Sequence, residues 1–308
     1  MKLIVKLKGR FEQSSVVTQF LILVFTTIAG LTMTSIMSSI ILIMKFGTES
    51  LMIVRESPEW MKNMQFFQTI GVFIFPAIIC AWLFSDNYKS YLHIDTAFQG
   101  SIIGLVMLSI LVIIPFLNGI YVFNQQMVFP KCLNGLEAWM KNYEKLSQNV
   151  IERMLYVYRW QDLVSNILIV CIFTAIGEEF IFRGILQNLL NRFIKNQYLV
   201  IWIVAILFSI VHLQFYGFLS RMLLGAYLGY LLYYTGNIWI SILAHFMNNF
   251  LGVINSYIFQ DNPKMVERIN NIGSGTTWWL SIVSLTLFFI LFYIIKDCVS
   301  SNHPNCFD

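Results

Sequence analysis

Long uninterrupted apolar runs dominate the hydrophobic pattern of this chain. A helix needs about 20 mostly apolar residues to cross the hydrocarbon core of a bilayer. Runs near that length recur along the chain, and they lack the strict alternation of a membrane β-strand. The sequence therefore predicts an all-α polytopic membrane protein with about eight transmembrane helices. We place them at residues 16–46, 66–84, 101–123, 163–190, 198–214, 218–234, 238–259 and 278–295.

The segment between the third and fourth predicted spans is the main extramembrane part of the chain. Apolar residues recur in it every three or four positions, which is typical of an amphipathic helix. They are Leu136, Trp139, Tyr143, Leu146, Val150, Met154 and Val157. Glu137 and Lys141 have i,i+4 spacing on its polar side. We interpret the segment as a helix that lies on the bilayer or caps the bundle, with a lid over a site as the alternative.

These patterns divide the chain into five parts. They are a basic N-terminal segment (1–15), N-terminal transmembrane helices (16–123), an amphipathic connecting segment (124–161), a core of transmembrane helices (162–260) and a last helix with its tail (261–308). Four basic residues before the first span favour a cytoplasmic N-terminus, and that span is too long for a cleaved signal peptide. Gly225 and Gly229 are spaced to let the sixth predicted span pack closely against a neighbour.

Composition excludes several other classes of protein. Only 12% of the 308 residues are charged and 57% are hydrophobic, so a soluble fold could not cover its apolar surface. The same values exclude a disordered chain, and five cysteines are too few for a disulfide scaffold. The net charge of +4 comes with no dense basic patch. We therefore expect a lipid bilayer as partner and no nucleic acid.

Three charged residues interrupt the fourth predicted span. They are Glu178, Glu179 and Arg183. A charge at the bilayer centre costs about 2.5–3.5 kcal/mol on insertion scales. Glu179 and Arg183 have i,i+4 spacing, which predicts an ion pair on one helix face. Glu178 is turned away from Glu179 by about 100°, so the pair does not account for it, and a carboxyl in an apolar setting suits acid–base chemistry.

Two histidines lie in or at the end of other apolar spans. A single histidine of this kind is more often a hydrogen-bond donor between helices than a catalyst. However, His212 shares a helix face with Phe208, and His245 shares one with Asn249, each at i,i+4. Together with Glu178 these residues suggest water activation. Glu178 would take a proton from water with the help of His212, while His245 and Asn249 would donate to a developing oxyanion.

Three short motifs now stand in order on successive predicted spans. Residues 178–183 read E-E-x-x-x-R, residues 208–212 read F-x-x-x-H and residues 245–249 read H-x-x-x-N. Their combination resembles the CAAX protease and bacteriocin-processing family of intramembrane glutamic endopeptidases, which includes the Abi proteins. The resemblance covers roughly residues 165–255.

The resemblance implies an eight-helix intramembrane endopeptidase without a cofactor. It implies that Glu178 is the general base assisted by His212 and that His245 and Asn249 form the oxyanion site. Glu179, Arg183 and Phe208 would be supporting residues. It also implies a peptide or membrane-protein substrate. The composition favours a bacterial cytoplasmic membrane, so we do not extend the prenyl-protein role of some family members to this chain.

Other interpretations of the same residues stay open. Glu178, His212 and His245 are suitable zinc ligands, which would make the protease zinc-dependent, although the H-E-x-x-H pattern is absent. A non-catalytic membrane protein for bacteriocin immunity or scaffolding would retain the motifs. A proton-coupled transporter also uses buried carboxylates and histidines, but no repeated half supports it. The sequence does not specify an oligomeric state.

Overall fold

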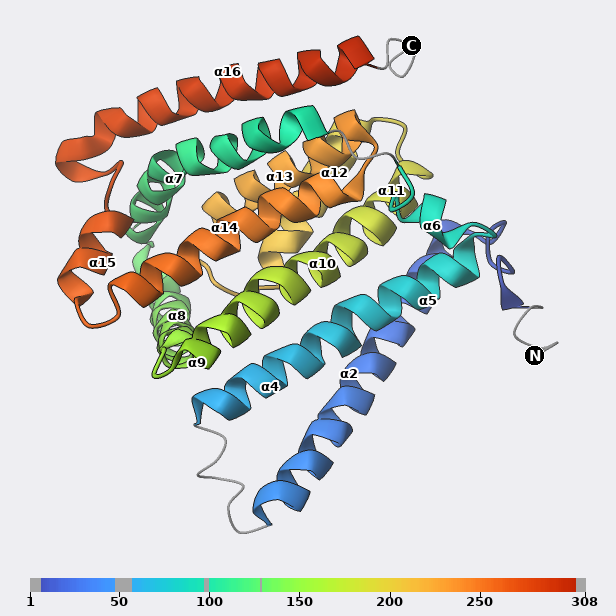
Figure 1. Cartoon of the computed structure of the whole chain (residues 1–308), viewed down its shortest axis with the longest axis horizontal. Coiled ribbons are helices and arrows are strands. Elements are labelled where there is room, and N and C mark those ends of the chain that lie inside the picture. Colours follow the sequence, from blue (N-terminus) through green and yellow to red (C-terminus); the bar gives the residue numbers. More distant parts are fainter. Residues whose placement is uncertain (1–6, 48–56, 97–99, 128, 303–308) are drawn as a thin grey trace.

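The computed structural model describes residues 7–47, 57–96, 100–127 and 129–302. Every regular element in these ranges is helical, and none of the described residues forms a β-strand. The long helices pack side by side in one bundle. The first residues of α2 (Val16–Phe46) and the last residues of α16 (Trp278–Asn302) lie at the same end of this bundle (Figure 1). The all-α prediction is confirmed.

The N-terminal part consists of two long helical rods that pack against each other. Its elements are α2 (Val16–Phe46), α4 (Pro58–Gln68), the π-helical turn η1 (Thr69–Ile74), α5 (Phe75–Phe84) and α6 (Tyr88–Tyr91). The rods touch at Gly30 and Gly71. The two backbones are so close there that a Cβ atom on Gly30 would overlap the Gly71 carbonyl oxygen. This is the close backbone approach that small residues permit between membrane helices.

A second pair of helices covers the opposite side of the bundle (Figure 1). Its elements are η2 (Gly100–Ile102), α7 (Ile103–Gln125), α15 (Pro263–Asn270), η6 (Gly275–Thr277) and α16 (Trp278–Asn302). The hydroxyl of Ser281 donates to the Pro115 carbonyl at 2.9 Å, and Ser284 donates to the Val112 carbonyl. Such interhelical hydrogen bonds hold α7 and α16 together in an apolar setting.

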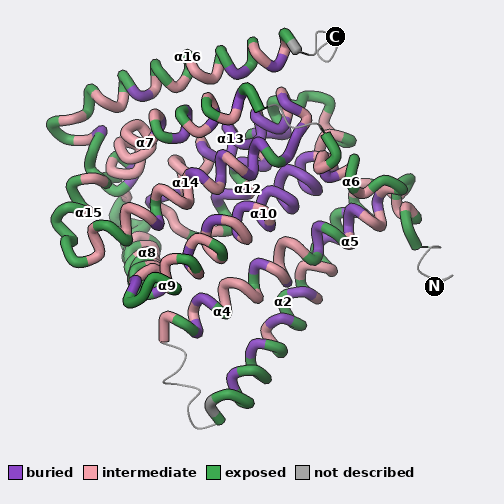
Figure 2. The backbone as a smooth tube through the Cα atoms, in the orientation of Figure 1, coloured by how far each residue is buried: buried purple, intermediate pink, exposed green. Residues whose placement is uncertain are grey.

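The most buried helices lie between these two pairs. In chain order they are α9 (Trp160–Asn166), η4 (Ile167–Phe173), α10 (Thr174–Glu179), η5 (Phe180–Gln187), α11 (Asn188–Asn191), α12 (Gln197–Ile210), α13 (Phe218–Thr235) and α14 (Ile238–Ile258). The first five follow one another without a break, and η4 and η5 are π-helical. Figure 2 shows buried residues concentrated on α10, α12, α13 and α14.

Helices α12 and α13 pack tightly, as the glycine spacing predicts. A Cβ atom on Gly229 would lie 2.9 Å from Cγ2 of Ile201, and one on Gly225 would lie 3.1 Å from Cδ1 of Phe208. Neither position has room for a larger side chain without a shift of its neighbour. The glycines therefore bring the α13 backbone against α12.

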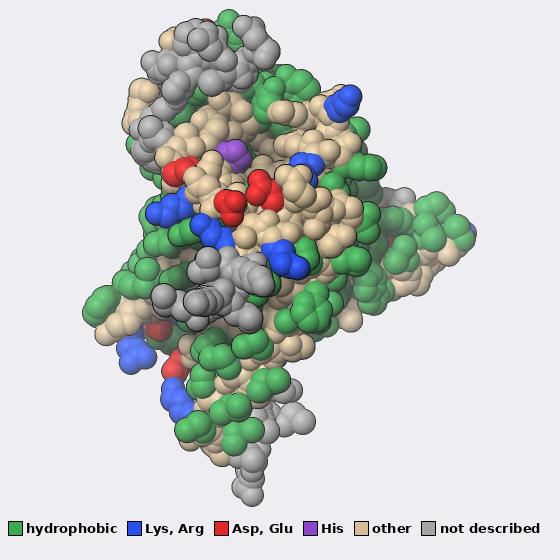
Figure 3. All heavy atoms as spheres, turned by 90° about the vertical axis from the view of Figure 1, so that its right-hand side faces the viewer, with side chains coloured by type: hydrophobic (Ala, Val, Ile, Leu, Met, Phe, Trp, Pro, Cys, Tyr) green, Lys and Arg blue, Asp and Glu red, His purple; other side chains and the backbone are tan. Residues whose placement is uncertain are grey.

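Six of the described helical segments are long and apolar enough to cross a membrane. They span residues Val16–Lys45, Pro58–Phe84, Gly100–Gln125, Trp160–Asn191, Ile238–Ile258 and Pro263–Ser301. The chain is therefore a polytopic integral membrane protein. The predicted span at 198–214 is shorter in the structure, where α12 ends at Ile210, and α13 does not belong to the six. Charged side chains gather on one end face of the bundle, and hydrophobic ones cover its flanks (Figure 3).

The predicted amphipathic helix is present as α8 (Asn134–Leu155), preceded by η3 (Lys131–Leu133). Glu137 and Lys141 form the predicted pair at 2.6 Å. The predicted apolar stripe is largely left outside the packing, with Leu136, Trp139, Leu146 and Val150 exposed. Met154 and Val157, at the C-terminal end of that stripe, are buried instead, and Glu144 and Ile151 on an adjacent stripe are half-buried. The arrangement fits a helix whose apolar side rests on lipid.

Candidate active site

Glu178 lies between His212 and His245. Its carboxylate is buried on α10, with Oε1 3.8 Å from Nε2 of His212 and Oε2 3.7 Å from Nε2 of His245. His212 follows the end of α12, and His245 lies on α14, so three parts of the chain converge here. Both distances exceed a direct hydrogen bond. The spacing therefore suits a water molecule that bridges the carboxylate and an imidazole.

Each histidine ring is held through its other nitrogen. Nδ1 of His212 lies 2.7 Å from the Phe208 carbonyl oxygen, and Nδ1 of His245 lies 2.8 Å from Oε1 of Glu179. A carbonyl or carboxylate oxygen only accepts, so each Nδ1 carries the donated hydrogen. Both rings therefore present Nε2 to Glu178, and Nε2 of a neutral ring can accept a proton.

Glu179 and Arg183 form the ion pair that their spacing predicts. Nη1 of Arg183 donates to Oε1 of Glu179 at 2.9 Å, and both side chains are fully buried. Nη2 donates to the Gly225 carbonyl at 2.8 Å. The guanidinium also stacks 4.8 Å from the centre of the Phe208 ring. The pair fixes His245, because Glu179 accepts hydrogen bonds from both.

Phe208 packs against several of these groups at once. Its ring meets His212 and His245 edge-on, with centroids 5.0 and 5.9 Å apart. The same ring carries Arg183 on its face, and its backbone carbonyl orients His212. Phe208 therefore sets the positions of both imidazoles while excluding water from the buried pair.

Asn249 lies one helical turn beyond His245, as the i,i+4 spacing predicts. Its Nδ2 donates to the Val170 carbonyl at 3.1 Å, and its Oδ1 accepts from Asn248 at 3.2 Å. Val170 belongs to the π-helical turn η4, in which the hydrogen-bonding pattern of an α-helix is interrupted. One amide hydrogen is thus committed to the helix that carries Glu178, and the second is available to a ligand.

Arg221 belongs to this region, although the candidate set from the sequence omitted it. It lies in the first turn of α13, and its charge interacts with Glu178 and with His212. A signal was present in the sequence, since Arg221 is the only Asp, Glu, Lys or Arg between Lys195 and Asp261.

Zinc binding by these donors stays a prediction. Glu178, His212 and His245 are suitable types of zinc ligand, and a second partner orients each ring as in many metal centres. Yet among the residues that the structure describes, no group of three or more His, Cys, Asp or Glu is arranged to hold a metal ion. We therefore derive no catalytic step through zinc.

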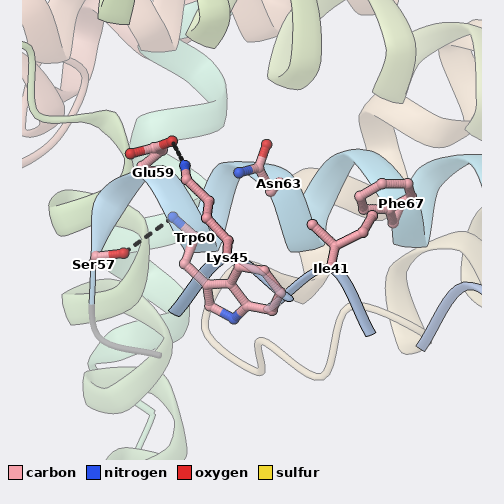
Figure 4. Close-up of a pocket in the computed structure, with 7 residues that line it drawn as sticks. All are labelled: Ile41, Lys45, Ser57, Glu59, Trp60, Asn63 and Phe67. Carbon is pink, nitrogen blue, oxygen red and sulfur yellow. Dashed lines mark hydrogen bonds and ion pairs between the residues drawn. The ribbon is translucent and has the colours of Figure 1, made fainter. Parts of the chain in front are cut away.

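A surface cavity lies apart from these residues. It has a volume of about 210 Å³ between α2 and α4, and it is lined by Ile41, Lys45, Ser57, Glu59, Trp60, Asn63 and Phe67 (Figure 4). Lys45 and Glu59 form an ion pair across it at 2.9 Å. None of the site residues contributes to its walls.

Comparison with known proteins adds an independent observation. Residues 160–251 match the family model of the type II CAAX prenyl endopeptidase Rce1-like proteins. The chain carries an Rce1-like domain. This family consists of peptide hydrolases, and its match confirms the resemblance that the three motifs carry. No curated protein and no solved structure gives a significant match.

The Rce1-like domain begins with α9 and ends within α14. It therefore contains Glu178, Glu179, His212 and His245, whose side chains converge in the structure. Helices α2 to α8 and α15 to α16 lie outside the matched region.

Proposed function

We propose that this protein is an intramembrane endopeptidase that hydrolyses a peptide bond with an activated water. Glu178 takes a proton from a water molecule held between its carboxylate and Nε2 of His212. The hydroxide attacks the scissile carbonyl carbon, and the proton then passes to the leaving amine as the carbon–nitrogen bond breaks. The substrate is a peptide or a membrane protein.

His245 and Asn249 stabilise the oxyanion. They lie one turn apart on α14, where they can donate hydrogen bonds to the oxyanion that forms during attack. His245 does so as the imidazolium, which keeps its Nδ1 hydrogen on Glu179 and carries a second hydrogen on Nε2. Glu179, Arg183 and Phe208 hold the two imidazoles in place. The observation that carries this proposal is the buried Glu178 carboxylate, with an oriented imidazole nitrogen 3.8 and 3.7 Å away on either side.

The same proposal extends to membrane topology. Helix α12 has 14 residues, and it is therefore about 21 Å long at a rise of 1.5 Å per residue. We infer that α12 and α13 form a hairpin that enters the bilayer without reaching the far surface, which brings the helices that enter the membrane to eight. The protein would lie in a bacterial cytoplasmic membrane with its N-terminus on the cytoplasmic side.

The test uses the full chain reconstituted in lipid vesicles and a library of synthetic peptides, with cleavage detected by mass spectrometry. Glu178→Gln and His212→Ala should each lower cleavage about 10²–10⁴-fold, the usual contribution of general acid–base catalysis. Glu267→Gln, a change of an exposed carboxylate on α15, is the matched control and should leave cleavage unchanged.

Two outcomes would contradict the proposal. If the Glu178→Gln variant cleaves as well as the parent, Glu178 is not the base. If no peptide is cleaved by the parent while the protein still protects cells against a bacteriocin, the non-catalytic alternative gains support.

A further inference from the structure

A second polar cluster lies next to the proposed catalytic groups. Its members come from separate parts of the fold, namely Tyr121 on α7, Glu144 on α8, Tyr216 in the α12–α13 loop and Arg221 on α13. Their charges and dipoles interact with one another, and Arg221 also interacts with Glu178. The cluster is joined to the loop that carries His212, because Nη2 of Arg221 donates to the side chain of Gln214, two residues after His212.

The loop that supports Arg221 is firmly held. The Asn124 side chain donates to the backbone carbonyls of Phe215 and Tyr216, each at 2.9 Å. The Trp139 ring of α8 packs against Phe215 with centroids 5.3 Å apart. Leu213 has a φ of 54°, a left-handed conformation that side chains other than glycine rarely adopt and that surrounding structure must enforce. These contacts fix the loop and thereby the position of Arg221.

One terminal nitrogen of Arg221 has no hydrogen-bond partner among the residues that the structure describes. One of its nitrogens, Nη2, donates to the Gln214 side chain. Its other terminal nitrogen, Nη1, is buried and has no hydrogen-bond partner among the residues that the structure describes. A guanidinium remains charged at any physiological pH, and a buried charge without a partner is costly.

The nearby carboxylates do not provide a hydrogen-bond partner for Nη1 of Arg221. Glu178 and Glu144 both attract Arg221 through space, but neither accepts a hydrogen bond from Nη1, and Oε2 of Glu144 is itself buried without a partner in the described part of the chain. A guanidinium donor left unpaired beside a catalytic carboxylate is the kind of group that binds an anion of the substrate.

We propose that Nη1 of Arg221 binds a carboxylate of the peptide substrate. The inference rests on the proposed endopeptidase function and names a determinant of its substrate class. The carboxylate is either the C-terminal carboxylate of the peptide or an Asp or Glu side chain near the scissile bond. Peptides with such a group would be held with their backbone beside Glu178, on the His212 side of the site.

The test starts from one peptide that the reconstituted protein cleaves. That peptide is synthesised as the free acid, as the C-terminal amide and with each Asp or Glu changed to Asn or Gln. The value of kcat/KM is measured for the parent, Arg221→Gln, Arg221→Lys and the control Arg268→Gln, which removes an exposed cation of α15.

The expected result is selective. For the parent, one of the neutralised peptides should be cleaved about 10- to 100-fold less efficiently, the range that a hydrogen bond to a charged group supplies. That peptide identifies which carboxylate binds. Arg221→Gln should cause the same loss with the charged peptide and no further loss with the neutral one. Arg221→Lys should retain part of the preference, and Arg268→Gln all of it.

Other results would overturn the inference. They are an equal loss for charged and neutral peptides in Arg221→Gln, or a parent that cleaves all the peptides alike. If Arg221→Gln fails to fold, judged by size-exclusion chromatography in detergent, the comparison of peptides on the parent decides. Glu178→Gln distinguishes failure of the proposed function from failure of the carboxylate site. Cleavage that persists in Glu178→Gln refutes the proposed endopeptidase mechanism. If Glu178→Gln loses cleavage but Arg221→Gln affects charged and neutral peptides equally, only the carboxylate site is refuted.

Discussion

Removing one partner of the buried pair of Glu179 and Arg183 should be among the most destabilising single substitutions in this fold. Arg183→Met keeps an apolar chain of similar length but leaves the Glu179 carboxylate without its guanidinium. It also removes the hydrogen bond to the Gly225 carbonyl and the contact with the Phe208 ring. Breaking a buried pair from one side costs about 3–5 kcal/mol. His245 still donates to Glu179, so we expect the lower end, about 3 kcal/mol.

The chain offers a matched control with the same spacing. Glu137 and Lys141 also pair at i,i+4, at 2.6 Å, but on α8 with the Lys141 side chain 60% exposed and the Glu137 side chain 19% exposed. Solvent screens such a pair, so Lys141→Met should leave stability unchanged within error. Unfolding is followed by the loss of helical circular dichroism in mixed detergent micelles as the fraction of sodium dodecyl sulfate rises. The reasoning is refuted if Arg183→Met destabilises no more than Lys141→Met.

The double variant Glu179→Gln, Arg183→Met refines this result. It removes both charges, and replacing a buried pair with neutral groups is often far less costly than breaking it. We expect it to be more stable than Arg183→Met alone. Equal stability of the two variants would mean that the lost contacts with Gly225 and Phe208, rather than the orphaned carboxylate, account for the cost.

Further predictions concern catalysis, packing and pH. Asn249→Ala should lower kcat by about 10²–10³-fold with little change in KM, because an oxyanion donor acts in the transition state; a change confined to KM would contradict this in steady-state assays of peptide cleavage. Gly229→Ala should cost about 1–3 kcal/mol of stability by overpacking, whereas Gly252→Ala, where a Cβ atom would meet nothing within 4 Å, should not destabilise the protein in the same detergent titration. Burial raises the pKa of the Glu144 carboxyl above its ordinary value of 4.5, so its ionisation destabilises the folded state as the pH rises through the raised pKa. Glu144→Gln should therefore be more stable than the parent at neutral pH and should lose this advantage below pH 4.5. Thermal unfolding measured across this pH range checks the difference. Peptide cleavage should persist after dialysis against a strong chelator, and activity that requires added zinc would support the metal-dependent alternative.

The sequence was informative wherever a single helix determines the geometry. Helical periodicity alone places Glu179 on the same face as Arg183, and Phe208 on the same face as His212, and the structure joins both pairs. The spans follow for a similar reason, since apolar runs of sufficient length must be helical in lipid. The boundaries of α2 and α13 agree with the predicted ranges almost to the residue.

Contacts between helices could not be read from the pattern. Nothing in the sequence indicates that Asn249 donates to Val170, because that carbonyl belongs to a π-helical turn whose presence depends on packing. The orientation of α8 is another case, since its more apolar stripe faces outward while Glu144 faces the bundle. Hydrophobicity alone does not distinguish lipid from protein as the surface against which an apolar side chain rests.

The sequence by itself determined that this is a helical membrane protein with an isolated carboxylate, two embedded histidines and a buried ion pair. It did so because length, polarity and helical period are local properties of the chain. Only the tertiary structure decided that His245 is held by Glu179, that Glu178 lies between both imidazoles and that Arg221 adjoins them. Those relations depend on how α10, α12, α13 and α14 pack against one another. That packing is fixed by the close contacts of glycines such as Gly225, and not by any period within one helix.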